Sequence, residues 1–109
     1  MPKEKEEVKP NYAPIYAAAL YPKLAKLFVM NGYALAVHGS LARDFDLIAV
    51  PWAKKITSPN AMLSLITKMF DIQLLGKGEK KNHGRVAYTI SVGFGSCALD
   101  LSFLTSPKE

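Results

Sequence analysis

The stretch HGSLARDFD, residues 38–46, decides how the rest of the chain is interpreted. It separates two short apolar runs, residues 33–37 and 47–50, whose lengths are typical of buried strands. A glycine directly after the first run favours a sharp bend of the backbone. Successive side chains of a strand alternate in direction, so Asp44 and Asp46 share one face, about 6.6 Å apart along the strand. The stretch therefore predicts two strands joined by a short turn, with two aspartates side by side on the second.

The flanking sequence predicts further strands and two helical regions. Residues 15–20 favour a short helical turn, a second helix begins at Pro22, and Asn31 with Gly32 marks its end. Ser58 and Pro59 predict the start of another helix, whose apolar face comprises Met62, Leu63, Ile66, Met69 and Phe70. The remaining chain comprises an ambiguous segment at 72–75 that could begin an edge strand, a basic loop at 76–84, a strand at 85–92, a turn at 93–96 and a last strand at 98–104. The expected fold class is α/β (α+β), a small mixed sheet of about four strands with helices packed on it.

Composition limits the class of protein. The 109 residues are 50% apolar and 21% charged, which predicts one globular domain over residues 11–109 after a charged tail at 1–10. A single cysteine, Cys97, excludes an internal disulfide and a multi-cysteine zinc site. No apolar run reaches 18 residues and the first nine residues are mostly charged, so we expect neither a membrane span nor a signal peptide. These features predict a cytoplasmic protein.

Positive charge is concentrated in one segment. The net charge is +5, and the three lysines and three glutamates of residues 1–9 cancel. Lys77, Lys80, Lys81 and Arg85 stand against Glu79 alone, a local charge of +3. Such a cluster suits a polyanion, either a nucleic acid or a nucleoside triphosphate, and a solvated loop is the alternative.

The aspartates suggest a metal-dependent phosphate chemistry. Asp44 and Asp46 repel each other unless a cation lies between them, and carboxylates are ligands that magnesium prefers. If the last strand lies beside the strand of Asp46, Asp100 becomes the third member of the cluster. Gly39 and Ser40 supply a close backbone approach and a hydroxyl donor for phosphate oxygens. A phosphate-binding turn that faces metal-binding carboxylates is what nucleotidyl transfer requires.

Each of these features also has a simpler explanation when it is taken alone. A Gly-Ser pair is usually only a turn, Asp44 and Asp46 could begin a solvated strand, and Asp100 could face water at a sheet edge. The order of strand, glycine turn, carboxylate pair and late carboxylate favours the functional interpretation.

The same residues carry a resemblance to a known family. The run His38-Gly39-Ser40 followed by Asp44-Phe45-Asp46, with Asp100 on a later apolar strand, resembles the DNA polymerase beta-like nucleotidyltransferase superfamily. The likeness covers residues 34–50 and 98–104 and is greatest to small stand-alone members, including some that phages encode.

The resemblance implies a role for each residue. Gly39 and Ser40 would hold the β- and γ-phosphates of a nucleoside triphosphate, and Arg43 could neutralise their charge. Asp44, Asp46 and Asp100 would hold two Mg²⁺ (or Mn²⁺) ions, and Asp100 would help to deprotonate the hydroxyl of a nucleic-acid or protein acceptor.

Two departures from the family pattern motivate an alternative. The spacer between Gly-Ser and Asp-x-Asp is only Leu41-Ala42-Arg43, and 109 residues leave no room for an acceptor domain, so a partner protein or a second copy would supply that site. The alternative is a catalytically weak or inactive module of the same fold that binds a nucleotide, a nucleic acid or a partner. A third possibility is a magnesium-independent nucleic-acid binder that uses the basic segment at 77–85.

Overall fold

A computed structural model describes residues 13–41, 44–70, 72–92 and 98–104 of the chain. In these segments two α-helices, five strands and a short 3₁₀ turn follow one another: α1 (Ala13–Met30), β1 (Tyr33–His38), β2 (Phe45–Pro51), α2 (Pro59–Phe70), β3 (Gln73–Lys80), the turn η1 (Asn82–Gly84), β4 (Arg85–Ser91) and β5 (Ala98–Leu104). The predicted class, helices packed on a small mixed sheet, is confirmed. The tail at residues 1–10 and the predicted turn at 93–96 lie outside the described residues.

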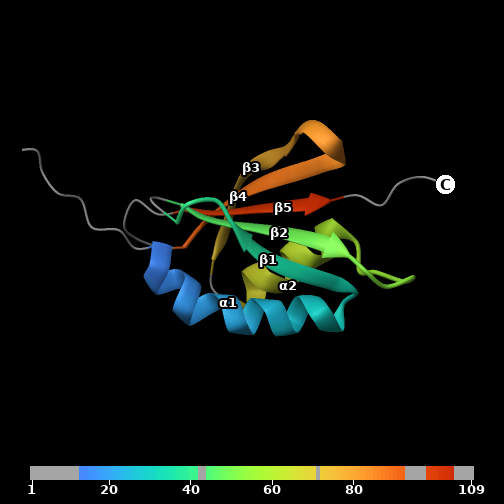
Figure 1. The fold of residues 1–109 in the computed structure, drawn as a ribbon, viewed down its shortest axis with the longest axis horizontal. Coiled ribbons are helices and arrows are strands. Elements are labelled where there is room, and N and C mark those ends of the chain that lie inside the picture. The colour runs from blue at the N-terminus through green and yellow to red at the C-terminus, as the bar shows by residue number, and fades with distance from the viewer. Residues whose placement is uncertain (1–12, 42–43, 71, 93–97, 105–109) are drawn as a thin grey trace, which may run out of the picture.

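The strands form one mixed sheet in the order β1-β2-β5-β4-β3. Three of the four pairings are antiparallel, and β2 with β5 is the parallel one. The sheet therefore consists of two antiparallel hairpins, β1–β2 and β3–β4, with the last strand inserted between them (Figure 1).

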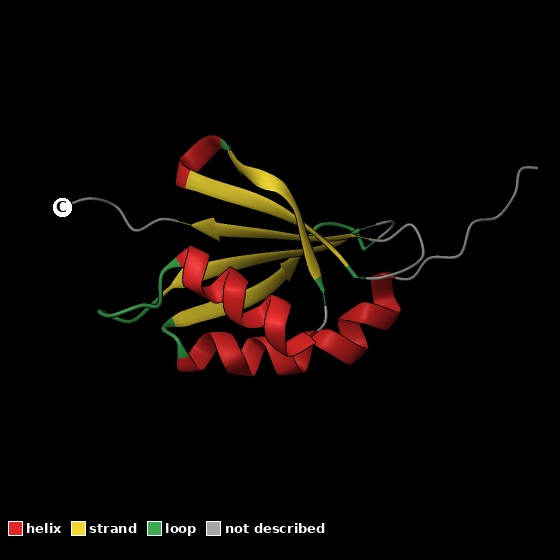
Figure 2. Ribbon diagram, turned by 180° about the vertical axis from the view of Figure 1, so that it is seen from behind, coloured by secondary structure: helices red, strands yellow, loops and turns green. Residues whose placement is uncertain are grey.

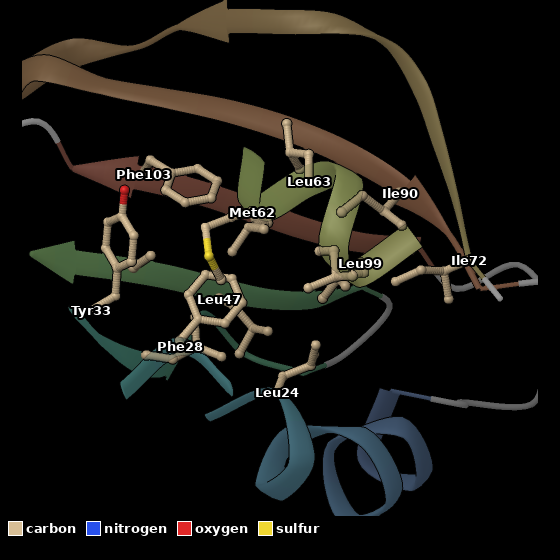
Figure 3. Close-up of a cluster of buried hydrophobic side chains, with 14 of the residues drawn as sticks. Leu24, Phe28, Tyr33, Leu47, Met62, Leu63, Ile72, Ile90, Leu99 and Phe103 are labelled. Atoms are coloured by element: carbon tan, nitrogen blue, oxygen red, sulfur yellow. The ribbon is translucent and has the colours of Figure 1, made fainter. Parts of the chain in front are cut away.

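Both helices cover the same face of the sheet. In Figure 1 α2 lies behind the strands, and in the reverse view of Figure 2 it lies in front of them, with α1 running alongside. The buried side chains of the two helices join those of the strands in one core, shown in Figure 3. The opposite face of the sheet carries no helix among the described residues; we call it the open face.

Alternation of side chains assigns residues to the two faces. In β2 Phe45, Leu47 and Ala49 are fully buried, and in β5 Leu99 and Leu101 are buried in the same way. Phe103 continues this row, and its ring lies 6.0 Å from that of Phe28 and 5.4 Å from that of Tyr33, measured between centroids. The alternate residues of β2 and β5 consequently point to the open face.

The helix boundaries follow signals in the sequence, with one exception. Gly32 adopts a positive φ of 93° directly after α1, and Ser58 Oγ accepts a hydrogen bond of 3.2 Å from Ala61 N at the start of α2. The expectation of two helices separated at Pro22 is wrong, because α1 continues through this proline. The Tyr21 hydroxyl, which donates a 2.6 Å hydrogen bond to Leu35 O, and buried Leu24 anchor the turns on either side of it to the sheet.

The sheet has one strand more than the four that the sequence predicts. The expected basic loop at 76–84 is in its first half a strand: β3 extends to Lys80 and pairs with β4, with a shift in register between Leu75 and Glu79. Gly76 and Gly78 interrupt the apolar alternation there, which is why the sequence suggests a loop. Met69, expected on the buried face of α2, is largely exposed.

Neither helix in the described part of the chain is long and apolar enough to cross a membrane.

Candidate active site

A row of polar residues crosses the open face at equivalent positions of neighbouring strands. The register pairs His38 of β1 with Asp46 of β2, Asp46 with Asp100 of β5, and Asp100 with Thr89 of β4. Residues paired in register point to the same face, so these four side chains lie next to one another. The structure thus brings together two acidic residues that are 54 positions apart in the sequence, as expected if the last strand lies beside β2.

Asp44 lies in a bend directly before β2, and it is close enough to Asp100 to raise the pKa of that carboxyl. Its Oδ1 accepts a long hydrogen bond of 3.4 Å from the backbone N of Ala98, the first residue of β5. This contact holds the turn before β2 against the strand that carries Asp100. All three predicted carboxylates therefore gather where β2 and β5 begin.

Gly39 provides the turn that wraps around Asp46. It follows β1 with a positive φ of 80°, a conformation that side chains with a Cβ rarely adopt. A Cβ at this position would also collide with the Asp46 carboxylate. Leu41, the first residue of the spacer, has a φ of 58° and is a second left-handed residue close to this turn. Ser40 is exposed at this bend, and Arg43 lies outside the described residues.

The two neighbouring aspartates act electrostatically on Asp100. The pKa of Asp100 is raised above its usual value, first because burial disfavours the charged form and then because Asp46 and Asp44 are negative. Lys81 and His38 are close enough to oppose the increase. The negative charges repel one another at neutral pH, which a cation would relieve.

These residues fit magnesium when it is bound together with phosphates. Within the described residues, no group of three or more His, Cys, Asp or Glu side chains is arranged so that it could hold a metal ion by itself. Magnesium, however, is usually held by one or two carboxylates together with substrate phosphates and water rather than by a cage of protein ligands. The adjacent carboxylates of Asp46 and Asp100 match this arrangement, with Asp44 beside them.

A pocket of about 230 Å³ adjoins Asp100 on its β4 side. We call it the hairpin pocket, because all of its lining residues except Asp100 come from the β3–β4 hairpin: Leu75, Lys77, Glu79, Lys81, Ala87, Thr89 and Asp100. The sequence singled out the lysines as a basic cluster but placed them in a loop. It missed Thr89, since only the register of β4 against β5 brings this hydroxyl beside a carboxylate.

Ser102 lies two residues beyond Asp100 on the same face and is almost fully buried. The guanidinium Nη1 of Arg85 donates a 3.1 Å hydrogen bond to its Oγ. This places another basic residue of the hairpin over β5, next to the row of polar residues.

Comparison with known proteins adds no identification: no family model matches the chain, and neither a curated protein nor a solved structure is a significant match.

Proposed function

We propose that this protein is a metal-dependent nucleotidyltransferase, which moves a nucleoside monophosphate from a nucleoside triphosphate to a hydroxyl acceptor. One observation carries the proposal above the others: Asp46 and Asp100 are paired in register, and the carboxylate of Asp46 lies against the glycine bend at residue 39. Carboxylates for divalent cations and a bend for phosphates are thereby adjacent on one exposed face.

In this proposal the chain positions the reactants and balances their charge. Gly39 and Ser40 bind the β- and γ-phosphates. Asp44, Asp46 and Asp100 would hold Mg²⁺ or Mn²⁺, which would neutralise the charge of the triphosphate. Asp100 takes the proton of the acceptor hydroxyl. The acceptor oxygen forms a bond to the α-phosphorus, the bond from that phosphorus to the bridging oxygen breaks, and pyrophosphate leaves with the electron pair.

Without a bound cation, burial and then the negative charges of Asp46 and Asp44 raise the pKa of Asp100. A divalent cation held by the same carboxylates would oppose this increase, so the base role of Asp100 rests on its position beside the hairpin pocket.

A transfer assay tests the proposal. The protein is incubated with each of the four labelled nucleoside triphosphates, with Mg²⁺ or Mn²⁺, and with RNA, DNA or protein acceptors. We expect metal-dependent transfer of label that is lost in Asp46→Asn and in Asp100→Asn. Lys68→Gln, which alters one charge on the exposed side of α2, is the control and should retain the activity.

The assay also distinguishes the enzyme from the alternative function, a nucleotide-binding module without catalytic turnover. Metal-dependent binding of a triphosphate without transfer to any acceptor would support a module of this fold that binds nucleotides but has no turnover. No binding and no transfer at millimolar metal and nucleotide would contradict both functions.

A further inference from the structure

We propose that the hairpin pocket binds the acceptor and that this acceptor is a nucleic-acid strand, held by its phosphodiester backbone on Lys77 and Lys81. The proposal rests on the nucleotidyltransferase function and names the acceptor that the function leaves open. It assigns the binding of the acceptor to the β3–β4 hairpin.

The position of the pocket in the sheet is the first argument. The strand order places the glycine bend on the β1 side of the carboxylates and the hairpin pocket on the β4 and β3 side. In an in-line displacement the entering oxygen and the leaving pyrophosphate lie on opposite sides of the reacting phosphorus. If the triphosphate tail lies at Gly39 and Ser40, the acceptor therefore approaches from the side of the hairpin.

Asp100 links the pocket to the reaction. It is both a wall of the pocket and the register partner of Asp46. A hydroxyl that enters the pocket would come next to the carboxylate of Asp100. Thr89, paired with Asp100 across β4 and β5, adds a hydroxyl that can donate to a phosphate or sugar oxygen.

The charge of the hairpin identifies the chemistry of the ligand. Lys77 and Lys81 line the pocket, and residues 77–85 carry a local charge of +3. Lys81 forms an ion pair of 3.0 Å with Glu79, but both side chains are well exposed, so the pair is weak and Lys81 can turn to a phosphate. Exposed lysines on a groove that continues to solvent are typical of backbone binding to nucleic acids.

The size of the pocket argues against a small-molecule acceptor. Its volume of about 230 Å³ is below the range of roughly 300–1,000 Å³ that is typical of pockets enclosing a whole small ligand. A pocket of this size could take up the terminal sugar of a longer strand, whose remaining nucleotides would run outside along the lysines.

Binding measured without metal and without nucleotide tests this inference independently of transfer. The probes are fluorescent 12-nucleotide single strands of RNA and DNA with a free 3′ hydroxyl, titrated by anisotropy in the presence of a chelator at several salt concentrations. We expect weak binding that decreases steeply with salt. Lys77→Gln combined with Lys81→Gln should weaken binding on the order of tenfold at low salt and reduce the salt slope by about 1.4, because each phosphate contact on a single strand contributes about 0.7.

Matched variants distinguish the pocket from overall charge. Lys80 belongs to the same hairpin but lines a different pocket, with Gly84 and Val86 among its neighbours, and Lys68 lies on α2. Lys80→Gln combined with Lys68→Gln removes the same charge and should leave most of the affinity intact. Glu79→Gln, which frees Lys81 from its ion pair, should increase the affinity.

Three results would overturn the inference: no binding of either strand by the unaltered protein, an equal loss in the control pair of lysines, or equally strong binding of a poly-glutamate peptide. Where transfer is observed, the Lys77→Gln, Lys81→Gln double variant should raise KM for the oligonucleotide and leave KM for the triphosphate unchanged.

The two proposals fail in different ways. Transfer to a protein or to a small molecule, without any binding of oligonucleotides, would refute the acceptor assignment and leave the nucleotidyltransferase standing. Strand binding through the lysines, without transfer to any acceptor, would refute the enzyme and leave the pocket as a nucleic-acid site.

Discussion

The carboxylate of Asp46 lies against the backbone of Gly39, so closely that a methyl group at position 39 would collide with it. This contact joins the turn after β1 to the carboxylates of the candidate site. Replacement of Gly39 by a residue with a Cβ is therefore unfavourable for two separate reasons, the positive φ and the collision. Gly76 has a positive φ without such a collision, so its replacement measures the first effect alone.

Gly39→Ala should destabilise the protein more than Gly76→Ala does. Both glycines have a positive φ, 80° and 70°, which costs an alanine about 1–2 kcal/mol. Only at position 39 does a Cβ meet other atoms, while at position 76 nothing lies within 4 Å. We expect a loss of about 2–4 kcal/mol for Gly39→Ala in urea unfolding, including overpacking, and about 1–2 kcal/mol for Gly76→Ala.

Truncation of the aspartate checks the cause of the difference. In an Asp46→Ala background the additional cost of Gly39→Ala should disappear, leaving a loss similar to that of Gly76→Ala. Equal losses for the two glycines in the unaltered background would show that the Asp46 contact has no energetic role.

Asp100→Asn should stabilise the metal-free protein at neutral pH. The pKa of Asp100 is higher in the folded state than in the unfolded state. At pH values between these two pKa values, the folded state therefore binds more protons than the unfolded state does. Stability falls as the pH rises through this window, and the charged side chain is unfavourable above it. Two unit charges 4 Å apart repel by about 1 kcal/mol in water, and 1 kcal/mol shifts Tm by about 4–8 °C in a domain of this size.

Thermal unfolding at pH 7 and at pH 3 measures this effect. The gain in Tm for Asp100→Asn, on the order of 4 °C, should be present at pH 7 and absent at pH 3, where the aspartate is protonated as well. Glu79→Gln removes an acid that is paired with Lys81 and should give no gain. A lower Tm for Asp100→Asn at pH 7 would contradict the repulsion.

Metal and nucleotide together should raise Tm, and acid should remove this effect. A ligand present at 100 times its Kd stabilises the folded state by about 2.7 kcal/mol. Protons compete for the same carboxylates, and the raised pKa of Asp100 makes the loss begin at a higher pH than for an ordinary aspartate, whose pKa is about 3.9. Differential scanning fluorimetry with Mg²⁺ and a triphosphate over a pH series measures the shift.

The double variant Asp46→Asn, Asp100→Asn is the control for metal binding. It should show no increase in Tm with metal and nucleotide at any pH. An increase as large as that of the unaltered protein would place the ligand elsewhere on the molecule.

Arg85→Met should cost about 1–3 kcal/mol, because it removes a donor from the buried hydroxyl of Ser102. Ser102→Ala removes the hydroxyl itself and should cost less, since the half-buried guanidinium can turn to water. In the Ser102→Ala background the cost of Arg85→Met should fall markedly. Strictly additive losses in urea unfolding would show that the hydrogen bond does not couple the two residues.

Local patterns predict much of this fold. Residues 47–50 and 98–104 have the apolar character of buried strands, and Ser58 with Pro59 predicts the beginning of α2 correctly. The patterns fail where tertiary contacts prevail over them: Tyr21 and Leu24 hold α1 together across Pro22, and pairing with β4 turns the glycine-containing segment at 76–80 into a strand.

The candidate site is predictable in its residue types and less so in its shape. That Asp44 and Asp46 lie close to each other follows from their spacing in the sequence, although Asp44 stands before β2 rather than within it. That Asp100 lies beside Asp46 depends on the pairing of β2 with β5, a contact between distant segments that no local pattern encodes. The same holds for Thr89 and the lysines, whose common pocket exists only because β4 lies next to β5 and β3 next to β4.

The insertion of β5 between the two hairpins has a consequence for biosynthesis. Of the five described strands, the one at the centre of the sheet is synthesised last, and until then the β1–β2 and β3–β4 hairpins have no common neighbour. A nascent chain that ends before residue 98 has neither a joined sheet nor Asp100, so the two hairpins and the candidate site come together only after β5 has been made.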